Sequence, residues 1–267
     1  MVCVTILGLL TSTLVVSSSG NPLHLTGLHS WLNGRIVGGE ETTIERFPFQ
    51  GSFRMYGYHR CGAVIIKAHV ATTAGHCVDD QDTWYLSVKA GVTEWEDEGM
   101  ELKVKDYIAH EDYSIRTLES DIALLFLEGG FEFSNTIQPI YLASYGEELH
   151  PSTKAYVSGW GTMKENGSAL SEKLRFAAVT IWDQEECEDA YEGINNVTST
   201  MICAGEPQGG VDPCEGDSGG PLIVGNKLFG TVSWGLGCAR PGKPSVYVKI
   251  SALRKWIDSK LLAANAN

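Results

Sequence analysis

Three short motifs carry side chains that together can hydrolyse an acyl bond. Ser218 lies in the stretch GDSGGP, where glycines allow backbone conformations closed to other residues and let a substrate carbonyl approach the chain. A serine hydroxyl is a weak nucleophile near neutral pH and needs a base to take its proton. His76, in the stretch TAGHC, is the candidate for that base because imidazole titrates near physiological pH.

Asp121 is the candidate that orients the base. It opens the apolar run DIALLF, where a buried carboxylate is costly unless it is paired. Each residue also has an ordinary reading: a serine in a turn, a structural histidine, an aspartate at a strand edge. The order His76, Asp121, Ser218 matches one of the three chain orders known for the serine-protease triad. The other histidines lack a comparable setting: His24, His29, His59, His69, His110 and His150.

The elements that must position these residues are mostly strands. Short runs rich in β-branched and aromatic residues alternate with glycine-containing turns, which is typical of an all-β barrel or sandwich. These runs are 62–66, 122–127, 154–158, 222–224 and 228–233. One helix is predicted at the C-terminus, where Ser251 precedes Leu253, Trp256, Ile257 and Leu261 at helical spacing.

The beginning of the chain predicts export and processing. Residues 1–20 carry no charged side chain and read as a signal peptide, because their apolar run is interrupted at Thr11 and is shorter than the roughly 20 residues of a membrane span. A membrane anchor is the alternative. Residues 21–35 read as a pro-peptide that ends at Arg35, immediately before Ile36, and residues 36–267 form one domain. We therefore expect a secreted, extracellular protein without a membrane span.

Cysteine content and charge narrow the class of protein further. Removal of Cys3 with the signal leaves six cysteines, and this even number in an exported chain predicts three disulfides. None of them forms a C-x-x-C pair, so we expect no zinc site. The net charge of -13 argues against nucleic-acid binding, which requires a basic surface. In an exported chain the sequons at Asn166 and Asn196 predict glycosylation.

Further motifs accompany the three that carry chemistry, and together they resemble the trypsin-like serine proteases of the chymotrypsin/trypsin family. The resemblance covers nearly all of residues 36–267 and implies two antiparallel six-stranded β-barrels with the active site between them, plus a C-terminal helix. It also implies that Ser218 attacks the peptide carbonyl, and that backbone N–H groups of Gly216 and Ser218 form the oxyanion hole. The motifs are IVGG at 36–39, TAGHC at 73–77, DIALL at 121–125, SGWGT at 158–162, MICAG at 201–205, GDSGGP at 216–221 and SWG at 233–235.

The same resemblance implies how the enzyme is activated and which molecules bind it. Cleavage after Arg35 by an activating protease would free the amino group of Ile36 to pair with Asp217, and this pairing would order the oxyanion loop. Substrates would be proteins or peptides, protein protease inhibitors would be partners, and no cofactor or metal would be needed. The implied disulfides are Cys61–Cys77, Cys187–Cys203 and Cys214–Cys238.

The resemblance also places a specificity pocket. Asp212 corresponds to the acidic residue at its floor and implies cleavage after Arg or Lys, although an Asp before Pro213 is also an ordinary turn. The resemblance makes Ser233, Trp234, Gly235 and Ser245 substrate-binding residues.

Ser245 departs from the trypsin pattern, which has a glycine at this position, and Pro213 stands where serine or alanine is common. Arginine could then be disfavoured relative to lysine, basic side chains could bind through water, or the pocket could prefer other residues. The rivals are a protease of the same fold with chymotrypsin- or elastase-like preference and a non-catalytic homologue acting by binding. The presence of all three triad residues opposes the second rival.

Overall fold

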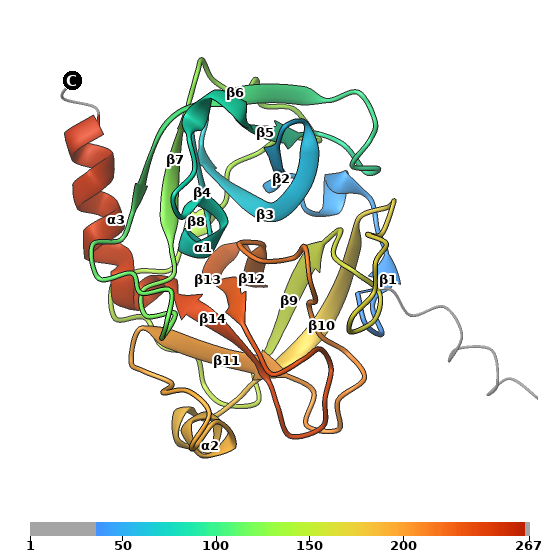
Figure 1. Cartoon of the computed structure of the whole chain (residues 1–267), viewed down its shortest axis with the longest axis vertical. Coiled ribbons are helices and arrows are strands. Elements are labelled where there is room, and N and C mark those ends of the chain that lie inside the picture. Colours follow the sequence, from blue (N-terminus) through green and yellow to red (C-terminus); the bar gives the residue numbers. More distant parts are fainter. Residues whose placement is uncertain (1–35, 265–267) are drawn as a thin grey trace, which may run out of the picture. The chain divides into compact units, whose positions relative to one another are not determined.

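The computed structural model describes residues 36–264, so the predicted signal peptide and pro-peptide lie outside the described residues. Strands dominate the described residues, joined by turns and four short helical segments, with one longer helix at the C-terminal end (Figure 1). The elements are β1 (Glu40–Glu41), η1 (Ile44–Arg46), β2 (Gln50–Met55), β3 (Tyr58–Lys67), β4 (Val70–Thr73), α1 (Gly75–Val78), η2 (Thr83–Tyr85), β5 (Leu86–Ala90), β6 (Met100–Ala109), β7 (Ala123–Leu127), β8 (Tyr141–Leu142), β9 (Lys154–Gly159), β10 (Arg175–Ile181), α2 (Gln184–Ala190), β11 (Met201–Gly205), β12 (Pro221–Val224), β13 (Lys227–Trp234), β14 (Ser245–Lys249) and α3 (Ile250–Ala264).

The first half of the domain is a closed antiparallel barrel in the order β2-β3-β4-β7-β6-β5. Its interior is filled by apolar side chains that face inward from every strand, including Phe53, Ile65, Val88 and Leu125, each fully buried. Closure leaves no unpaired strand edge, and the strands bend around the barrel through register shifts such as that between Phe53 and Arg54.

The second half closes in the same way. Strands pair in the order β10-β11-β14-β13-β12-β9, and β9 pairs back with β10 to complete six strands. The short strands β1 and β8 add to β10 and β13 from outside. Val157, Val179, Leu222 and Tyr247 fill the interior. The expectation of two six-stranded antiparallel barrels is therefore confirmed, and the predicted strand runs fall on β3, β7, β9, β12 and β13.

A third apolar cluster joins the two barrels. It contains Phe49 and Leu124 from the first half and Trp160 and Phe229 from the second. The backbones also touch directly at Gly62, whose N–H donates to the Ser218 carbonyl at 2.8 Å. In Figure 1 the strands β2–β7 lie above β9–β14, with the segments that carry the predicted site between them.

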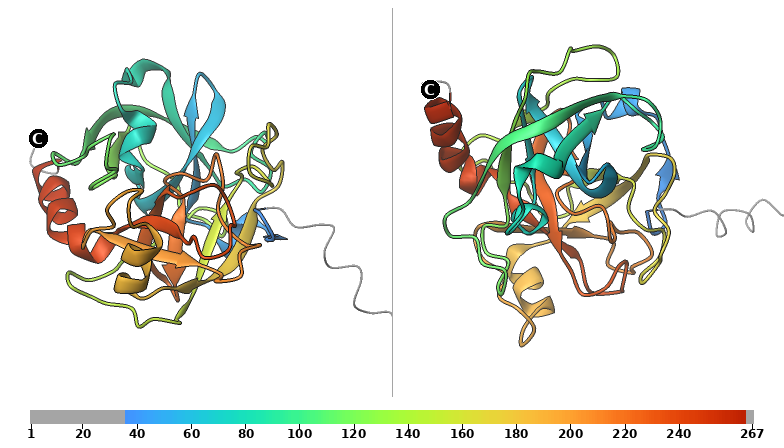
Figure 2. Two further views of the ribbon diagram at one scale, coloured as in Figure 1. Left: turned by 60° about the horizontal axis from the view of Figure 1, so that its bottom comes forward. Right: turned by 45° about the horizontal axis from the view of Figure 1, so that its top comes forward.

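The predicted C-terminal helix is confirmed as α3, with three of its four predicted apolar residues buried and Trp256 partly buried. Leu253, Ile257 and Leu261 are buried in the cluster that joins the barrels, and the Arg254 guanidinium donates to the Ala143 carbonyl at 3.0 Å. Both views of Figure 2 show α3 at the edge of the domain. Within residues 36–264 no helix is long and apolar enough to cross a membrane.

The sequence pattern did not predict the short helix α2. Asp183 caps its N-terminus, because the Asp183 carboxylate accepts the backbone N–H groups of Glu185 at 2.9 Å and Glu186 at 3.5 Å. Only Cys187 is buried in it, so it lacks the apolar stripe by which a helix is read from sequence.

Candidate active site

His76 and Asp121 form the best-defined pair of the site. His76 lies in the one-turn helix α1 directly after β4, and Asp121 lies just before β7, the strand that pairs with β4. The His76 ring nitrogen Nδ1 is 2.7 Å from Asp121 Oδ2, and the His76 backbone N–H donates to Asp121 Oδ1 at 2.8 Å. The structure thus brings together residues that are 45 positions apart in the chain.

The Asp121 carboxylate is fully buried and accepts a third hydrogen bond. Its donor is the Ser233 hydroxyl at 2.6 Å from Oδ2, contributed by the second barrel. Because a carboxylate only accepts, the His76 Nδ1 must carry the proton in this pair, which leaves Nε2 unprotonated in the neutral ring. The His76 side chain keeps 23% exposure, so this nitrogen belongs to a ring that solvent and substrate can reach. That is the tautomer a general base requires.

Ser218 lies in the loop between β11 and β12, held against the first barrel by its backbone. The Ser218 carbonyl accepts the Gly62 N–H, and Gly219 adopts φ +78°. A Cβ at Gly219 would lie 2.3 Å from Thr73 Oγ1 and 2.7 Å from the Ala74 nitrogen. Only glycine therefore lets this loop pack against the segment that leads to His76. Among the described residues no hydrogen bond joins the Ser218 hydroxyl to His76; such contacts are often long before substrate binds.

A histidine that the sequence reading set aside holds the predicted oxyanion loop. His59 Nε2 is 2.9 Å from the Gly216 carbonyl oxygen, and His59 Nδ1 is 2.8 Å from the Ser52 hydroxyl. Because a carbonyl only accepts, Nε2 is the donor and the Ser52 hydroxyl donates to Nδ1. Burial lowers the pKa of His59 to about 4, so the ring is neutral near pH 7. No local sequence signal marked His59, because its partner lies 157 residues away.

Asp217, the predicted partner of a freed Ile36 amino group, is buried at 1% exposure. Its carboxylate accepts the Gly161 N–H at 2.7 Å and the Cys214 N–H at 3.0 Å. Burial raises the pKa of Asp217 to about 6 in spite of these two donors. The Ile36 side chain is buried in the core of the second barrel, and the next residue, Val37, accepts the Asp212 N–H at 3.1 Å. The chain directly after the predicted cleavage point therefore pairs with the segment that contains Asp212.

A pocket of about 200 Å³ opens beside Ser218. Four of the five predicted substrate-binding residues line it, and Asp212 does not. The lining residues are Pro213, Cys214, Glu215, Ser218, Val232, Ser233, Trp234, Gly235, Gly237, Cys238 and Ser245. Glu215 is a carboxylate at this pocket that the sequence reading did not single out.

Asp212 lies behind the pocket lining, at 3% exposure. Its Oδ2 accepts the Ala239 N–H at 3.0 Å, whereas Oδ1 is sealed from solvent and makes no hydrogen bond of ordinary geometry, although the Ser245 hydroxyl lies close to the carboxylate. Burial raises the pKa of Asp212 to about 7, against the opposing effects of the Ala239 amide and the nearby Ser245 hydroxyl. A buried carboxylate with a free lone pair is costly unless something completes it.

All three predicted disulfides are present in the structure: Cys61–Cys77, Cys187–Cys203 and Cys214–Cys238. Cys77 directly follows His76, so the first disulfide ties α1 to β3. The third disulfide joins the Ser218 loop to the far wall of the pocket, since Cys214 and Cys238 both line it. The sequon residues Asn166 and Asn196 are both exposed on loops.

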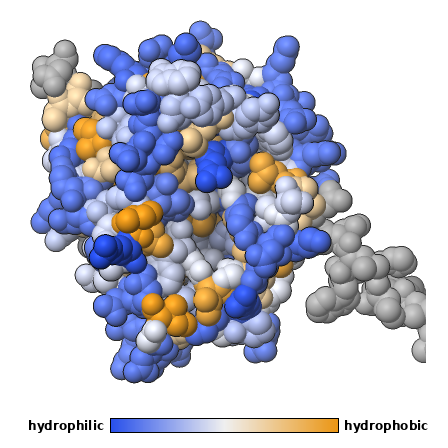
Figure 3. Space-filling model, in the orientation of Figure 1, coloured by the Kyte–Doolittle hydropathy of each residue, from blue (hydrophilic) through white to orange (hydrophobic). Residues whose placement is uncertain are grey.

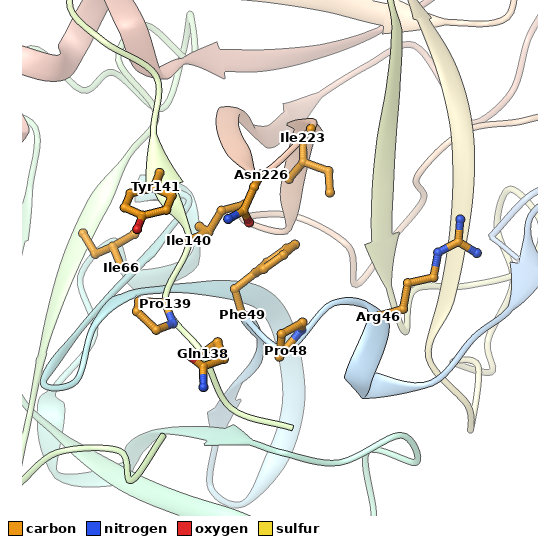
Figure 4. A pocket seen from close by; sticks show the side chains of 11 residues that line it. Arg46, Pro48, Phe49, Ile66, Gln138, Pro139, Ile140, Tyr141, Ile223 and Asn226 are labelled. Carbon is orange, nitrogen blue, oxygen red and sulfur yellow. The ribbon is translucent and has the colours of Figure 1, made fainter. Parts of the chain in front are cut away.

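A second hollow of about 500 Å³ lies where the two halves of the domain meet. Figure 4 shows Phe49 in its middle, with Arg46 at one end, away from the other labelled residues. None of the predicted site residues lines this hollow. Around the domain, the face in Figure 3 is mostly hydrophilic, with small separate hydrophobic patches.

Two closed barrels, with a His–Asp pair from the first and a glycine-rich serine loop from the second, define the chymotrypsin type of fold. Known proteins agree with this class. The family described as Trypsin matches residues 36–257. Trypsin alpha of Drosophila melanogaster is 42% identical over 234 residues, which are 87% of this chain and 90% of that protein.

Two further relatives carry other names. Hypodermin-B of Hypoderma lineatum is 43% identical over 232 residues, covering 86% of this chain and 89% of that protein. The vitellin-degrading protease of Bombyx mori is 38% identical over 261 residues, covering 98% of this chain and 94% of that protein. The chain belongs to the trypsin family and is a serine endopeptidase.

Proposed function

We propose that Ser218, His76 and Asp121 are the catalytic triad of this endopeptidase. The Ser218 hydroxyl attacks the substrate carbonyl while His76 Nε2 takes its proton and later returns it to the leaving amine. Asp121 holds the imidazole in the required tautomer and stabilises its charged form. The supporting observation is the fully buried Asp121 carboxylate, which accepts both the ring and the backbone N–H of His76.

The oxyanion of the tetrahedral intermediate is proposed to bind the backbone N–H groups of Gly216 and Ser218. Gly216 has φ +96°, a conformation that other residues rarely adopt. A Cβ at Gly216 would come within 2.8 Å of Leu170 Cδ2. Glycine at this position therefore supports the proposed role, in which the loop directs an N–H at the substrate carbonyl.

Activation is proposed to follow cleavage after Arg35 by a protease that cuts after arginine, with this enzyme itself as one candidate. The freed Ile36 ammonium would pair with Asp217, which is buried, holds two backbone donors and carries no cationic partner among the interactions described for residues 36–264. Secretion through the predicted signal peptide and glycosylation at Asn166 and Asn196 belong to the same proposal. Protein protease inhibitors would bind as substrate mimics.

Specificity is proposed to be for cleavage after Lys or Arg. Asp212 supports this, because its incompletely paired carboxylate is stabilised by a cationic side chain and not by an apolar one. The name of the Bombyx mori relative refers to a protein that it degrades, which agrees with a protein substrate. Preference for apolar residues, as in chymotrypsin- or elastase-like enzymes, is the alternative that the same assay tests.

The test uses protein cleaved after Arg35 and peptide substrates that differ only in the residue before the scissile bond. We expect turnover after Lys or Arg, and loss of that turnover in Ser218→Ala. Asp121→Asn should lower kcat by about 10⁴-fold, since the wrong imidazole tautomer is then favoured. Turnover only after apolar residues would refute the proposed specificity and leave the triad standing, whereas full activity of Ser218→Ala would refute the triad.

A further inference from the structure

Ser245 lies between the open pocket and the buried Asp212 carboxylate. It begins β14, is 4% exposed, and lines the pocket, which Asp212 does not. Asp212 Oδ1 is sealed from solvent, so a substrate side chain that enters the pocket meets the Ser245 hydroxyl before it meets the carboxylate. The residue that departs from the trypsin pattern thus occupies the point where recognition is decided.

The Ser245 side chain also reduces the space inside the pocket. A Cβ added at Gly235 would be 3.5 Å from Ser245 Oγ, in ordinary van der Waals contact. Gly235 and Ser245 are therefore neighbouring parts of the pocket lining, and the Ser245 hydroxymethyl group takes up space that a glycine would leave open. The whole pocket has a volume of about 200 Å³.

Lysine and arginine place different demands on such a site. An ammonium is a compact charge with three donors that can turn toward any acceptor, and a serine oxygen is sufficient for one of them. A guanidinium is a planar fork that binds a carboxylate best through two parallel hydrogen bonds, which requires direct access to both carboxylate oxygens. At Asp212 that access is restricted, because Oδ1 is sealed behind the lining and one lone pair of Oδ2 already accepts the Ala239 N–H.

The charges around the pocket favour a cation at this depth. Asp212 lies behind Ser245, and Glu215 lines the pocket. Among the described residues, the nearby Arg240 is paired with Glu165, and the Lys243 ammonium donates to the Ala190 carbonyl. Because both of these cations are already paired, a charged substrate side chain is the cation that faces Ser245 and the Asp212 carboxylate behind it.

We infer that Ser245 makes this protease selective for lysine over arginine, with its hydroxyl oxygen as the direct acceptor for the substrate ammonium and Asp212 as the charge behind it. This inference rests on the proposed cleavage after basic residues. Asp212 attracts both the lysine ammonium and the arginine guanidinium, so the inference assigns the discrimination between them to Ser245.

The experiment compares kcat/KM for two peptides that differ only by Lys or Arg before the scissile bond. In the wild-type enzyme we expect lysine to be preferred by at least about 10-fold, a difference of roughly 1.4 kcal/mol. Ser245→Gly should raise kcat/KM for the arginine peptide by about 10-fold or more and abolish the preference. Ser245→Ala separates bulk from hydrogen bonding: it should keep arginine poor, because Cβ remains, and lower lysine turnover severalfold, because the acceptor is gone.

Ser152→Gly is the matched control, since Ser152 is exposed, already has φ +68° and lies outside the pocket lining. It should leave both rates unchanged. A readout without turnover uses the cleaved Ser218→Ala protein: n-butylamine should bind more tightly than n-butylguanidine, and Ser245→Gly should reverse or erase the difference.

Two results would overturn the inference. Efficient cleavage after both basic residues with a Lys/Arg ratio unchanged by Ser245→Gly would refute the role of Ser245 and leave the proposed specificity intact. Turnover confined to apolar residues would refute the proposed basic specificity and the inference together.

Discussion

The His59 ring nitrogen Nε2 lies 2.9 Å from the Gly216 carbonyl oxygen, so a residue of the first barrel anchors the backbone of the proposed oxyanion loop in the second. The same peptide unit is held on its other side by the Asp217 N–H, which donates to the Cys214 carbonyl at 2.9 Å, and Gly216 itself has φ +96°. His59 is itself held by the Ser52 hydroxyl at 2.8 Å. We therefore regard His59 as a positioning residue that acts through Gly216.

Replacing His59 tests this role. His59→Phe removes the donor to Gly216 and should lower kcat by about 10- to 100-fold with little change in KM, a fraction of the 10²- to 10³-fold cost of losing an oxyanion donor. His59→Gln keeps an N–H donor and should restore part of the rate. If both variants lost stability but kept kcat, His59 would be merely structural.

His59 also predicts how stability depends on pH. Its folded pKa of about 4 is below the unfolded value of 6.5, so the unfolded chain binds the proton more tightly. The contribution of His59 to the free energy of unfolding is then present in full above pH 6.5 and falls as the pH is lowered toward 4. Denaturant titrations of the wild type and His59→Gln at pH 7 and pH 4.5 should show a smaller pH effect in the variant. An equal effect would contradict the prediction.

Gly219 should be intolerant of any side chain. A Cβ there would clash with Thr73 Oγ1 at 2.3 Å and with the Ala74 nitrogen at 2.7 Å, and the residue has φ +78°. Gly219→Ala should therefore unfold or inactivate the enzyme, with a loss of more than about 3 kcal/mol in the free energy of unfolding. Gly225→Ala is the control, since Gly225 has φ +60° but nothing within 4 Å. It should cost only about 1 kcal/mol, from backbone strain alone. Similar losses in the two variants would show that packing against Thr73 is not the cause.

Asp217 predicts a stability difference between the uncleaved and cleaved chains. Burial raises its pKa in the folded, uncleaved chain to about 6, so folding favours the protonated form. The contribution of Asp217 to the free energy of unfolding is present in full below about pH 4, the pKa range of an unfolded aspartate. It is lost as the pH rises through 6. Pairing with a freed Ile36 ammonium would favour the carboxylate and remove this loss.

Melting curves of Ser218→Ala protein before and after cleavage at Arg35 measure the difference. The advantage of the cleaved form should grow from pH 4 to pH 7, to the order of 3 kcal/mol for a shift of about two pKa units. Asp212 titrates in both forms, so its effect should largely cancel in the comparison. A constant difference across this range would contradict the pairing.

Asp212 predicts a substrate-dependent pH profile. Burial raises its pKa to about 7, and a lysine substrate needs the charged carboxylate. For such a substrate kcat/KM should fall as a proton binds Asp212 below pH 7. For a substrate with an uncharged side chain, protonation of Asp212 should leave kcat/KM unchanged. Identical acid limbs for the two substrates would exclude Asp212 from recognition.

Much of this protein can be read from local stretches of its sequence. The motifs around His76, Asp121 and Ser218 predicted the residues that the fold places at the junction of the barrels, and the alternation of apolar runs and glycine turns predicted an all-β domain. The helix α3 was predictable because its apolar stripe repeats within 15 residues. Such features are encoded by neighbours in the chain, which a sequence displays directly.

Tertiary structure decided the contacts that join distant segments. The Ser233 hydroxyl reaches Asp121 across 112 residues, and His59 reaches Gly216 across 157. The position of Asp212 behind Ser245 depends on how β14 packs against the Asp212 segment, and spacing along the chain carries no record of that packing. The sequence determined which reactive side chains and which local elements this enzyme contains, because residue type and local periodicity are properties of short segments. Only the closed barrels decided which of those groups meet, since burial and hydrogen-bond geometry arise when strands far apart in the chain pair.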